Sequence, residues 1–401
     1  MFGDAAARLG VDLLFATDRC HMLDDPWLDR AVPIRFHDEA SSVRAILEAA
    51  RAKPIDGILA VGDRPTVIAA LVARALGLPG HPPEAAAIAR HKQLTRERLR
   101  SAGLPAPWFR SVSIDADPRA IASTLTFPAV VKPVALSGSR GVIRADDART
   151  FVAAFARLQA LMRAPELRAE RNEAYGTALV EGFIPGREFA LEGLMHHGAL
   201  HVVALFDKPD PLDGPFFEET IYVTPSSEPP ARQRAIVAAV AAAAGAIGLH
   251  HGPIHAECRV NDEGVFVLEV AARPIGGLCA RVVDGLEESL LRHALGGPPD
   301  VWTLDRRASA VMMIPIPAPG IFRGVDGLDE ARRVGGIVDI QITAKLDQRL
   351  VPLPEGASYL GFIFARGDRP ADAVAALRAA HARLRFAIDA ELRVLAAGQL
   401  Q

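Results

Sequence analysis

The chain has 401 residues, of which half are hydrophobic, 23% are charged and only 6% are aromatic. A chain of this length can form two or three domains with substantial cores, and the composition is that of an ordinary soluble α/β protein. The formal net charge of −3 is too small to indicate a partner that is bound through bulk charge, so it argues against nucleic acid and against a charged membrane surface.

Cysteine usage and hydropathy point to a reducing compartment. Cys20, Cys258 and Cys279 form no CxxC pair and are odd in number, which disfavours a disulfide framework. The longest apolar run, residues 235–249, is rich in alanine and shorter than the roughly 20 residues that a membrane span needs. Asp12 interrupts the apolar run that a signal peptide would require. We therefore expect a cytoplasmic protein.

Strand, loop and helix alternate at the start of the chain. The runs VDLLFATD at 11–18 and DGILAVGD at 56–63 predict buried strands, and TVIAALVARALGL at 66–78 predicts a helix. This order favours βα units on a parallel sheet. The segment HKQLTRERLRSAGLPAPWF at 91–109 predicts a basic amphipathic helix that ends near its glycine and first proline.

A lysine and a glycine-rich loop follow in the next region, where short strands are joined by tight turns. The pairs Val130–Val131 and Val142–Ile143 predict strand ends on either side of the loop Ser137–Gly141. Taken alone, Lys132 could reach water along its stem, and the loop could be a simple turn. Glycines also let a backbone approach a ligand closely, and loop N–H groups can bind phosphate oxygens. The lysine precedes the glycines, which excludes a P-loop, and no GxGxxG opens a helix.

Further hairpins are predicted downstream. One has its turn at His197–Gly198, and a second, over 252–277, turns at the sequence NDEG. The last region predicts a strand with prolines at its end over 308–322 and an amphipathic closing helix over 371–388.

Two glutamates lie on the strands of the second hairpin. Glu257 in HAECRV and Glu269 in VFVLEV are each surrounded by residues that we expect to be buried. A buried carboxylate is costly unless it is paired or binds a metal. The turn between the strands can place the two side by side, and Mg²⁺ would then relieve their repulsion. For either glutamate alone an exposed edge position is the better interpretation; for the pair, with Arg273 following, we favour a metal site.

The order and spacing of these segments resemble the ATP-grasp superfamily, and within it the carboxylate–amine ligases typified by L-amino acid ligases. No single motif is specific, but the resemblance runs along almost the whole chain. The segments that carry it are GILAVGDRPTVIAALVARALGLPG, RHKQLTRERLRSAGLPAPWF, the lysine–glycine loop, LVEGFIPGREFALEG, HAECRV with VFVLEVAARPIGG, and VMMIPIPAPGIF.

The resemblance implies an α/β (α+β) chain with the ATP-grasp fold in three parts. A Rossmann-like βα domain would occupy residues 1–90 and the ATP-grasp domain residues 91–300, with a lid subdomain over 124–187. A C-terminal α+β domain would occupy residues 301–401.

The resemblance also implies which residues would bind ATP. Lys92 and Lys132 would contact the phosphates and the adenine side of the cleft, and the loop would close over the β- and γ-phosphates as a mobile lid. The lid residues are Ser137, Gly138, Ser139 and Gly141. The other implied contacts are Glu181 with the adenine amino group, the backbone of Phe183 and Ile184 with the adenine edge, Glu188 with the ribose hydroxyls, and Lys208 with a phosphate.

The metal and the substrates are implied in the same way. Glu257 and Glu269 would bind Mg²⁺, for which Mn²⁺ could substitute. Arg273 would neutralise the substrate carboxylate or the acyl phosphate formed from it, and His255 would stabilise the transition state with Lys132. The remaining implied substrate contacts are Glu219, which would bind an α-amino group, and the N–H groups of Gly276 and Gly277.

The chain departs from the superfamily pattern at two positions. Ala271 stands where many members have an asparagine that binds metal, which removes one ligand and puts the second Mg²⁺ in doubt. His91 precedes Lys92 where an acidic or amide residue is common, although the lysine itself is kept.

The expected activity is ATP-dependent joining of an amino acid to an amine. ATP would convert the carboxylate to an acyl phosphate, and the amine, preferably of a second amino acid, would displace phosphate to give a dipeptide-like amide. The partners would be small molecules, and a homodimer stays open.

Two alternatives stay open. The first is a biotin carboxylase-like or purine-pathway ATP-grasp enzyme, although no AMKM carrier sequence is present. The second is a non-catalytic ATP-binding regulator, for which Ala271 is the only support.

Overall fold

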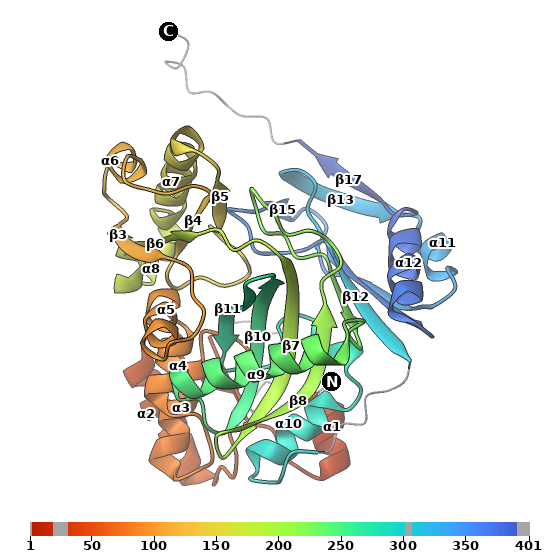
Figure 1. Ribbon diagram of the computed structural model, residues 1–401. Helices are drawn as coiled ribbons and strands as arrows, with labels where there is room; N and C mark the ends of the chain where they lie inside the picture. The colour runs from red at the N-terminus through yellow and green to blue at the C-terminus, as the bar shows by residue number, and fades with distance from the viewer. Residues whose placement is uncertain (1, 19–30, 301–306, 391–401) are drawn as a thin grey trace.

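The structure, a computed structural model, describes residues 2–18, 31–300 and 307–390 (Figure 1). Cys20 lies outside these residues. The chain has a mixed α/β fold, as predicted. None of the helices in the described ranges is long and apolar enough to cross a membrane.

The N-terminal part is mostly helical. Its elements are α1 (Phe2–Leu9), β1 (Phe15–Thr17), β2 (Ala31–Pro33), α2 (Glu39–Ala52), α3 (Thr66–Leu76), α4 (Pro83–Ala89) and α5 (Lys92–Ser101). The strands β1 and β2 pair in parallel, and α5 is the predicted basic helix. His91 caps α5, since its ring accepts the N–H of Leu94 at 3.4 Å. The unusual residue before Lys92 therefore has a structural role.

The predicted strand over 56–63 is wrong, because residues 54–61 belong to no strand. Ile58 packs among α2 and α3, and Leu59 packs on the opposite side with the cluster around α10 (Leu286–Ala294). A Cβ on Gly57 would lie 2.6 Å from the carbonyl oxygen of Ala294. The segment thus packs between helices with most of its apolar side chains half-buried, which explains its apolar sequence without a strand partner.

The lid is a separate four-stranded antiparallel sheet in the order β3-β6-β4-β5. Its elements are β3 (Phe109–Ser113), α6 (Pro118–Ala122), β4 (Ala129–Pro133), β5 (Ile143–Ala145), α7 (Ala148–Met162), α8 (Pro165–Ala169), a 3₁₀ turn (Glu173–Gly176) and β6 (Thr177–Gly182). Phe151, Phe155 and Leu158 of α7 are fully buried against the sheet. The predicted strand–loop–strand is confirmed, with Val131 opposite Ile143.

The centre of the molecule is an eight-stranded antiparallel sheet in the order β11-β10-β7-β8-β9-β12-β16-β14. Its first part contains β7 (Arg187–His196), β8 (Ala199–Asp207), β9 (Ile221–Thr224), α9 (Pro230–Ile247), β10 (Gly252–Asn261), β11 (Gly264–Ala271), a 3₁₀ turn (Cys279–Val282) and α10. The helix α9 runs across one face (Figure 1), where Ile236 and Val240 pack on Phe189. Leu286 and Leu290 of α10 pack on the other face.

Both predicted hairpins are present. His197 and Gly198 turn β7 into β8 with φ of 50° and 84°, the positive values that a type I′ turn requires. β10 and β11 pair antiparallel with Asn261 opposite Gly264.

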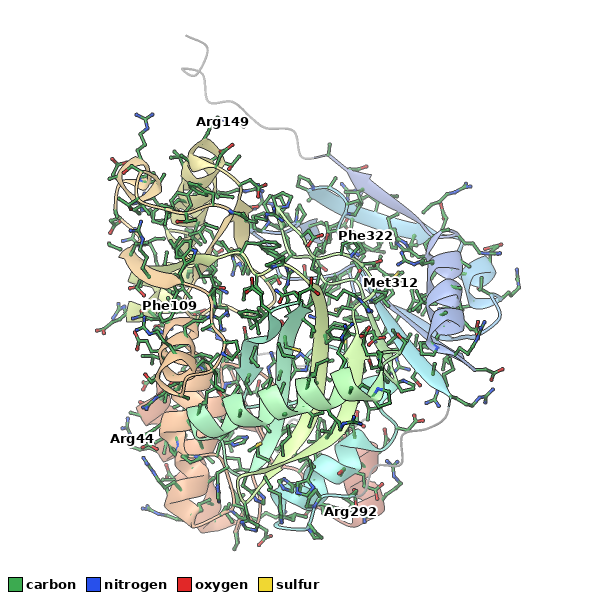
Figure 2. All side chains as sticks on the ribbon, in the orientation of Figure 1. Arg44, Phe109, Arg149, Arg292, Met312 and Phe322 are labelled. Carbon is green, nitrogen blue, oxygen red and sulfur yellow. The ribbon has the colours of Figure 1, made fainter. Side chains whose placement is uncertain are left out.

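The C-terminal part extends the central sheet. Its elements are β12 (Ala308–Ile314), β13 (Gly320–Asp326), α11 (Leu328–Arg332), β14 (Ile337–Ile342), β15 (Arg349–Leu350), β16 (Gly361–Gly367), α12 (Pro370–His381) and β17 (Arg385–Asp389). Met312 and Phe322 lie in its core, whereas Arg149 points outward from the lid (Figure 2). Because β9 pairs with β12, the boundary proposed at residue 300 lies between strands of one sheet, and the domain limits stay predictions.

The predicted closing helix over 371–388 is wrong in its second half. The helix α12 ends at His381, and β17 then pairs with β13. The side chains of Phe386 and Ile388 alternate with exposed residues and pack into the C-terminal core. Their spacing of two residues suits a strand and cannot keep one face of a helix buried.

The tip of the lid loop contacts the C-terminal part. Gly141 N–H donates to the carbonyl oxygen of Pro354 at 2.8 Å, and Arg140 Nε donates to the carbonyl oxygen of Glu355 at 2.7 Å. Arg157 of α7 forms an ion pair with the Glu355 carboxylate. These contacts close the loop against the C-terminal part, where the Arg140 side chain binds the backbone of Glu355.

Replacing Glu355 by Gln should loosen this closure. An exposed ion pair contributes at most about 1 kcal/mol, so the Gly141 N–H should exchange with solvent deuterium up to about fivefold faster. Hydrogen exchange measured by mass spectrometry on a peptide covering 134–142 tests this. Glu166→Gln is the matched control, because it removes only the more exposed partner of Arg140. Equal exchange in Glu355→Gln and wild type would show that the ion pair does not hold the lid.

Candidate functional site

One cavity of about 560 Å³ lies between the lid sheet and the central sheet. Most of the predicted site residues line it. They are Lys92, Lys132, Ser137, Gly138, Ser139, Glu181, Phe183, Ile184, Glu188, Glu219, His255, Glu257, Glu269, Arg273, Gly276 and Gly277. Gly141 and Lys208 do not line it. Gly141 packs against α7, where a Cβ would approach Leu158 to 3.0 Å, and Lys208 is buried behind three carboxylates.

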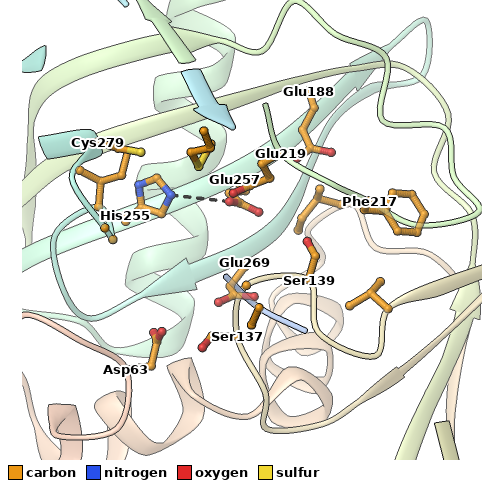
Figure 3. Close-up of a pocket in the computed structure, with 18 of the residues that line it drawn as sticks. Asp63, Ser137, Ser139, Glu188, Phe217, Glu219, His255, Glu257, Glu269 and Cys279 are labelled. Carbon is orange, nitrogen blue, oxygen red and sulfur yellow. Dashed lines mark ion pairs between the residues drawn. The ribbon is translucent and has the colours of Figure 1, made fainter. Parts of the chain in front are cut away.

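Glu257 and Glu269 lie directly opposite each other on β10 and β11, as predicted. Residues in such a pair point to the same face of the sheet, and both side chains face the cavity (Figure 3). Lys92 Nζ lies 3.1 Å from Glu269, and His255 Nε2 lies 3.6 Å from Glu257. The hairpin therefore presents two oxygen donors side by side in the cavity.

Lys208 neutralises an acidic cluster behind this pair. Its ammonium lies 2.8 Å from Glu188 and 3.3 Å from Glu257, and it also pairs with Glu219. Burial lowers the pKa of Lys208, but these carboxylates outweigh burial and raise it well above its usual value. The carboxylate oxygens of the three glutamates lie within 4.8 Å of one another, close enough to share a metal ion.

The pKa of Glu219, one member of this cluster, is shifted toward neutral pH. Burial and the neighbouring Glu257 raise its pKa to about 7, and the Tyr222 hydroxyl donates to its carboxylate at 2.7 Å. Near neutral pH this carboxylate can therefore accept or release a proton in response to a nearby charge.

A second charged group anchors the lid sheet to α5. Arg96 Nε donates to Glu181 at 2.9 Å, and Lys132 forms an ion pair with the same carboxylate. Burial lowers the pKa of Lys132 to about 8. For Glu181, burial raises the pKa, but Arg96 and Lys132 outweigh it and hold it at about 2. Glu181 is therefore a carboxylate with both oxygens engaged by protein cations.

Arg273 and His255 each have a carboxylate partner. Arg273 binds Asp63 through two hydrogen bonds of 2.8 and 3.1 Å. His255 Nδ1 lies 3.2 Å from Glu192, which also accepts the N–H of Ile275. Burial lowers the pKa of His255, but hydrogen bonds to Glu192 and Glu257 outweigh it and raise the pKa to about 9. His255 is therefore cationic at neutral pH.

Aromatic rings line the end of the cavity near Phe183. The rings of Phe183 and Phe217 stack with centroids 6.4 Å apart. The Arg144 guanidinium lies 4.0 Å from the Phe183 centroid, and that of Arg259 lies 5.1 Å from it. Arg259 also donates to Glu188 at 3.0 Å. This end of the cavity therefore combines flat apolar ring faces with nearby guanidinium groups.

Sequence reasoning missed Asp63, Arg96, Glu192 and Arg259 as site residues. Two of them carried a usable signal. Asp63 ends an apolar run immediately before a helix, and Arg96 follows Lys92 by four residues, which places both on one face of α5. Glu192 and Arg259 carried none, because they meet their partners through the pairing of β7 with β10, which neither predicted hairpin implies.

Three protein-family models match the chain. They are an ATP-grasp N-terminal domain over residues 3–80, an ATP-grasp domain over 125–282, and the L-amino acid ligase C-terminal domain 2 over 312–389. Together the matches cover the N-terminal part, the lid with most of the central sheet, and the C-terminal part.

Solved and curated proteins agree with these matches. The structure resembles an L-amino acid ligase from Bacillus licheniformis with a TM-score of 0.84 and 28% identity, covering 97% of this chain and 96% of that one. Carnosine synthase 1 of Gallus gallus is 31% identical over 62% of this chain and 27% of its own length. The alanine–anticapsin ligase of Bacillus subtilis is 27% identical over 60% of this chain and 53% of its own length. The chain thus spans less than two thirds of these two curated relatives.

Replacing Arg96 by Leu should destabilise the protein strongly. The change would leave the buried Glu181 carboxylate with Lys132 as its remaining partner among the ion pairs described above, and removing one member of a buried pair costs about 3–5 kcal/mol. The free energy of unfolding in urea measures the loss. Arg98→Leu is the matched control, because Arg98 lies on the exposed face of the same helix. Equal losses of unfolding free energy in the two variants would show that the buried ion pair does not stabilise the protein more than an exposed arginine does.

Proposed function

Because this chain belongs to the ATP-grasp superfamily and carries an L-amino acid ligase C-terminal domain, we propose that it is an ATP-dependent carboxylate–amine ligase. It would activate the carboxylate of one amino acid and join it to an amine, preferably that of a second amino acid. The observation that carries the proposal is the convergence in one cavity of paired glutamates, two lysines and the cations Arg273 and His255.

The nucleotide fits the half of the cavity beneath the lid. Lys92 and Lys132 would bind phosphate oxygens, and the glycines of the loop let its backbone approach them closely. The stacked rings of Phe183 and Phe217 suit the flat adenine base. Glu188 would reach the ribose only by sharing oxygens that Lys208 and Arg259 already hold.

Glu257 and Glu269 are the residues that would hold Mg²⁺. Their oxygens are the hard donors that this ion prefers, and the strand register aims both at the same space. Ala271 is buried and supplies no ligand, so these two carboxylates would be the protein ligands of the ion. A bound ion would neutralise charge on the transferring phosphoryl group.

The protein groups around the reacting carboxylate are cationic. Asp63 fixes the guanidinium of Arg273 through two hydrogen bonds, so that it can hold a carboxylate in one orientation. His255, cationic at neutral pH, would stabilise the negative charge that develops when phosphate transfers and when the amine attacks. The N–H groups of Gly276 and Gly277 would add further donors.

Two features favour amide formation over hydrolysis. The closed lid excludes water from an intermediate that water would destroy. A second cavity of about 580 Å³ shares Asp63, Lys92, Ser137 and Glu269 with the first and is also lined by Arg64, Arg90 and Arg140. Each of these arginines pairs with a carboxylate of the protein, Arg64 with Glu170, Arg90 with Glu39 and Arg140 with Glu166. A second amino acid would bind here by taking one of them from its partner.

The products of the reaction test the proposal. The protein with Mg²⁺ and ATP, supplied with pairs of amino acids, should form ADP, phosphate and a dipeptide, detected by phosphate release and mass spectrometry. Lys132→Met should lower turnover at least about 100-fold, because it removes a charge near the transferring group. Lys53→Met is the control, since Lys53 is exposed in the N-terminal part. AMP and pyrophosphate as products would contradict an acyl phosphate, and near-normal turnover in Lys132→Met would remove Lys132 from the site.

Glu219→Ala should weaken binding of the amino acid more than binding of ATP. A hydrogen bond to a charged group contributes about 1.5–3 kcal/mol, so the KM for the amino acid should rise at least about tenfold while the KM for ATP changes little. Glu218→Ala is the matched control, because Glu218 does not line the cavity. A similar rise of both KM values in Glu219→Ala would argue against an amino-group contact.

A further inference from the structure

Histidines gather at the end of the molecule away from the lid. His196 and His197 lie where β7 turns into β8, His250 and His251 immediately precede β10, and His293 lies in the last turn of α10. Figure 1 places α10 at the bottom of the view and the lid strands β4 and β5 at the top. None of these histidines lines the nucleotide cavity.

Three of these imidazoles converge. His196, His197 and His251 each place one ring nitrogen so that the three nitrogens lie within 4.8 Å of one another. Their ring centroids are 4.3, 5.3 and 5.6 Å apart. Zinc–nitrogen bonds of about 2.0–2.1 Å place the nitrogens of a tetrahedral site about 3.4 Å apart, so small rotations of the imidazoles would bring all three onto one ion.

The ring of His251 is oriented as a metal ligand would be. Its Nε2 lies 3.2 Å from the carbonyl oxygen of His293, so the proton is on Nε2 and donates to that carbonyl. The lone pair is then on Nδ1, which is buried and has no hydrogen-bond partner among the described residues. A buried polar nitrogen without a partner is unusual. A histidine that donates its second N–H to a backbone carbonyl is the typical arrangement around a bound metal.

Neighbouring histidines support this triad instead of competing with it. His293 stacks on His251 with centroids 4.0 Å apart and hydrogen-bonds through Nε2 to His196 Nδ1 at 3.2 Å. That bond leaves Nε2 of His196 for an ion. Both nitrogens of His81 are engaged, one with the carbonyl of Pro253 and one with the N–H of His250.

We propose that His196, His197 and His251 form a binding site for a borderline divalent transition-metal ion, with Zn²⁺ as the best fit. Neutral imidazoles suit Zn²⁺, Cu²⁺ and Ni²⁺, whereas Mg²⁺ prefers oxygen ligands. His197 is exposed and His196 is partly exposed, so an ion can enter from solvent and keep a water as its fourth ligand.

A metal at this site would connect the β7–β8 turn to the start of β10. β10 begins at Gly252 and carries His255 and Glu257. The ion would therefore lie roughly 13–20 Å along the strand from His255 and Glu257. It would stabilise the strand at the end that lies farther from the nucleotide cavity. It would not enter the nucleotide cavity.

Zinc titration of the full chain, without an added histidine tag and in excess Mg²⁺ to occupy the carboxylates, tests the proposal. Calorimetry should show one equivalent of Zn²⁺, and Co²⁺ in its place should give the intense visible absorption of a tetrahedral site. His251→Ala and His197→Asn should each raise the Kd for Zn²⁺ at least about tenfold, because loss of even an outer-shell partner of a metal ligand costs about 10–100-fold in affinity. Asparagine tolerates the positive φ of residue 197, so this variant keeps the turn.

The control is His37→Ala, an exposed histidine in the N-terminal part, which should bind Zn²⁺ as the wild type does. Thermal unfolding without metal shows whether each variant is folded, and added Zn²⁺ should raise the Tm of the wild type and of His37→Ala more than that of the two ligand variants. Absence of stoichiometric binding to the wild type, or an unchanged Kd in a folded His197→Asn variant, would overturn the proposal.

Discussion

The whole site depends on the pairing of buried charges. Burying an isolated charge is costly, yet the cavity walls and the layer of side chains behind them contain several buried carboxylates together with Arg96, Lys132 and Lys208. Each is matched: Lys208 is surrounded by three glutamates, and Glu181 is held between Arg96 and Lys132. The pairs fix the rotamers of groups that would otherwise be free to move, so the lid sheet, α5 and the central sheet are held in one relative position around the cavity.

This pairing also sets the chemistry that the walls can perform. Burial alone would lower the pKa of His255 and raise that of Glu181, but the charged partners outweigh burial and set the two values at about 9 and about 2. His255 is therefore cationic and Glu181 anionic at neutral pH. Preorganised charge of this kind favours reactions in which negative charge moves from one oxygen to another. The central sheet supplies the frame, because β10 and β11 carry His255, Glu257 and Glu269 in one hairpin.

Much of the fold and of the site could be predicted from local patterns. Three features depend on short segments whose turn residues can be recognised in the sequence. They are the hairpin at His197–Gly198, the strand–loop–strand around Ser137–Gly141, and the pairing of Glu257 with Glu269. Two elements were predicted wrongly because the same apolar residues suit more than one environment. Residues 56–63 pack between helices and are mostly half-buried, and the residues predicted to end the closing helix form a strand over 385–389.

The sequence by itself determined the residue types of the site and the hairpins that carry them, because turn chemistry and strand alternation act over a few neighbouring residues. Only the tertiary structure decided which charges meet. Asp63 reaches Arg273 across 210 residues, Arg96 reaches Glu181 across 85, and His251 reaches His293 across 42. Contacts at such separations depend on how the sheets and helices pack, and no local spacing records that packing.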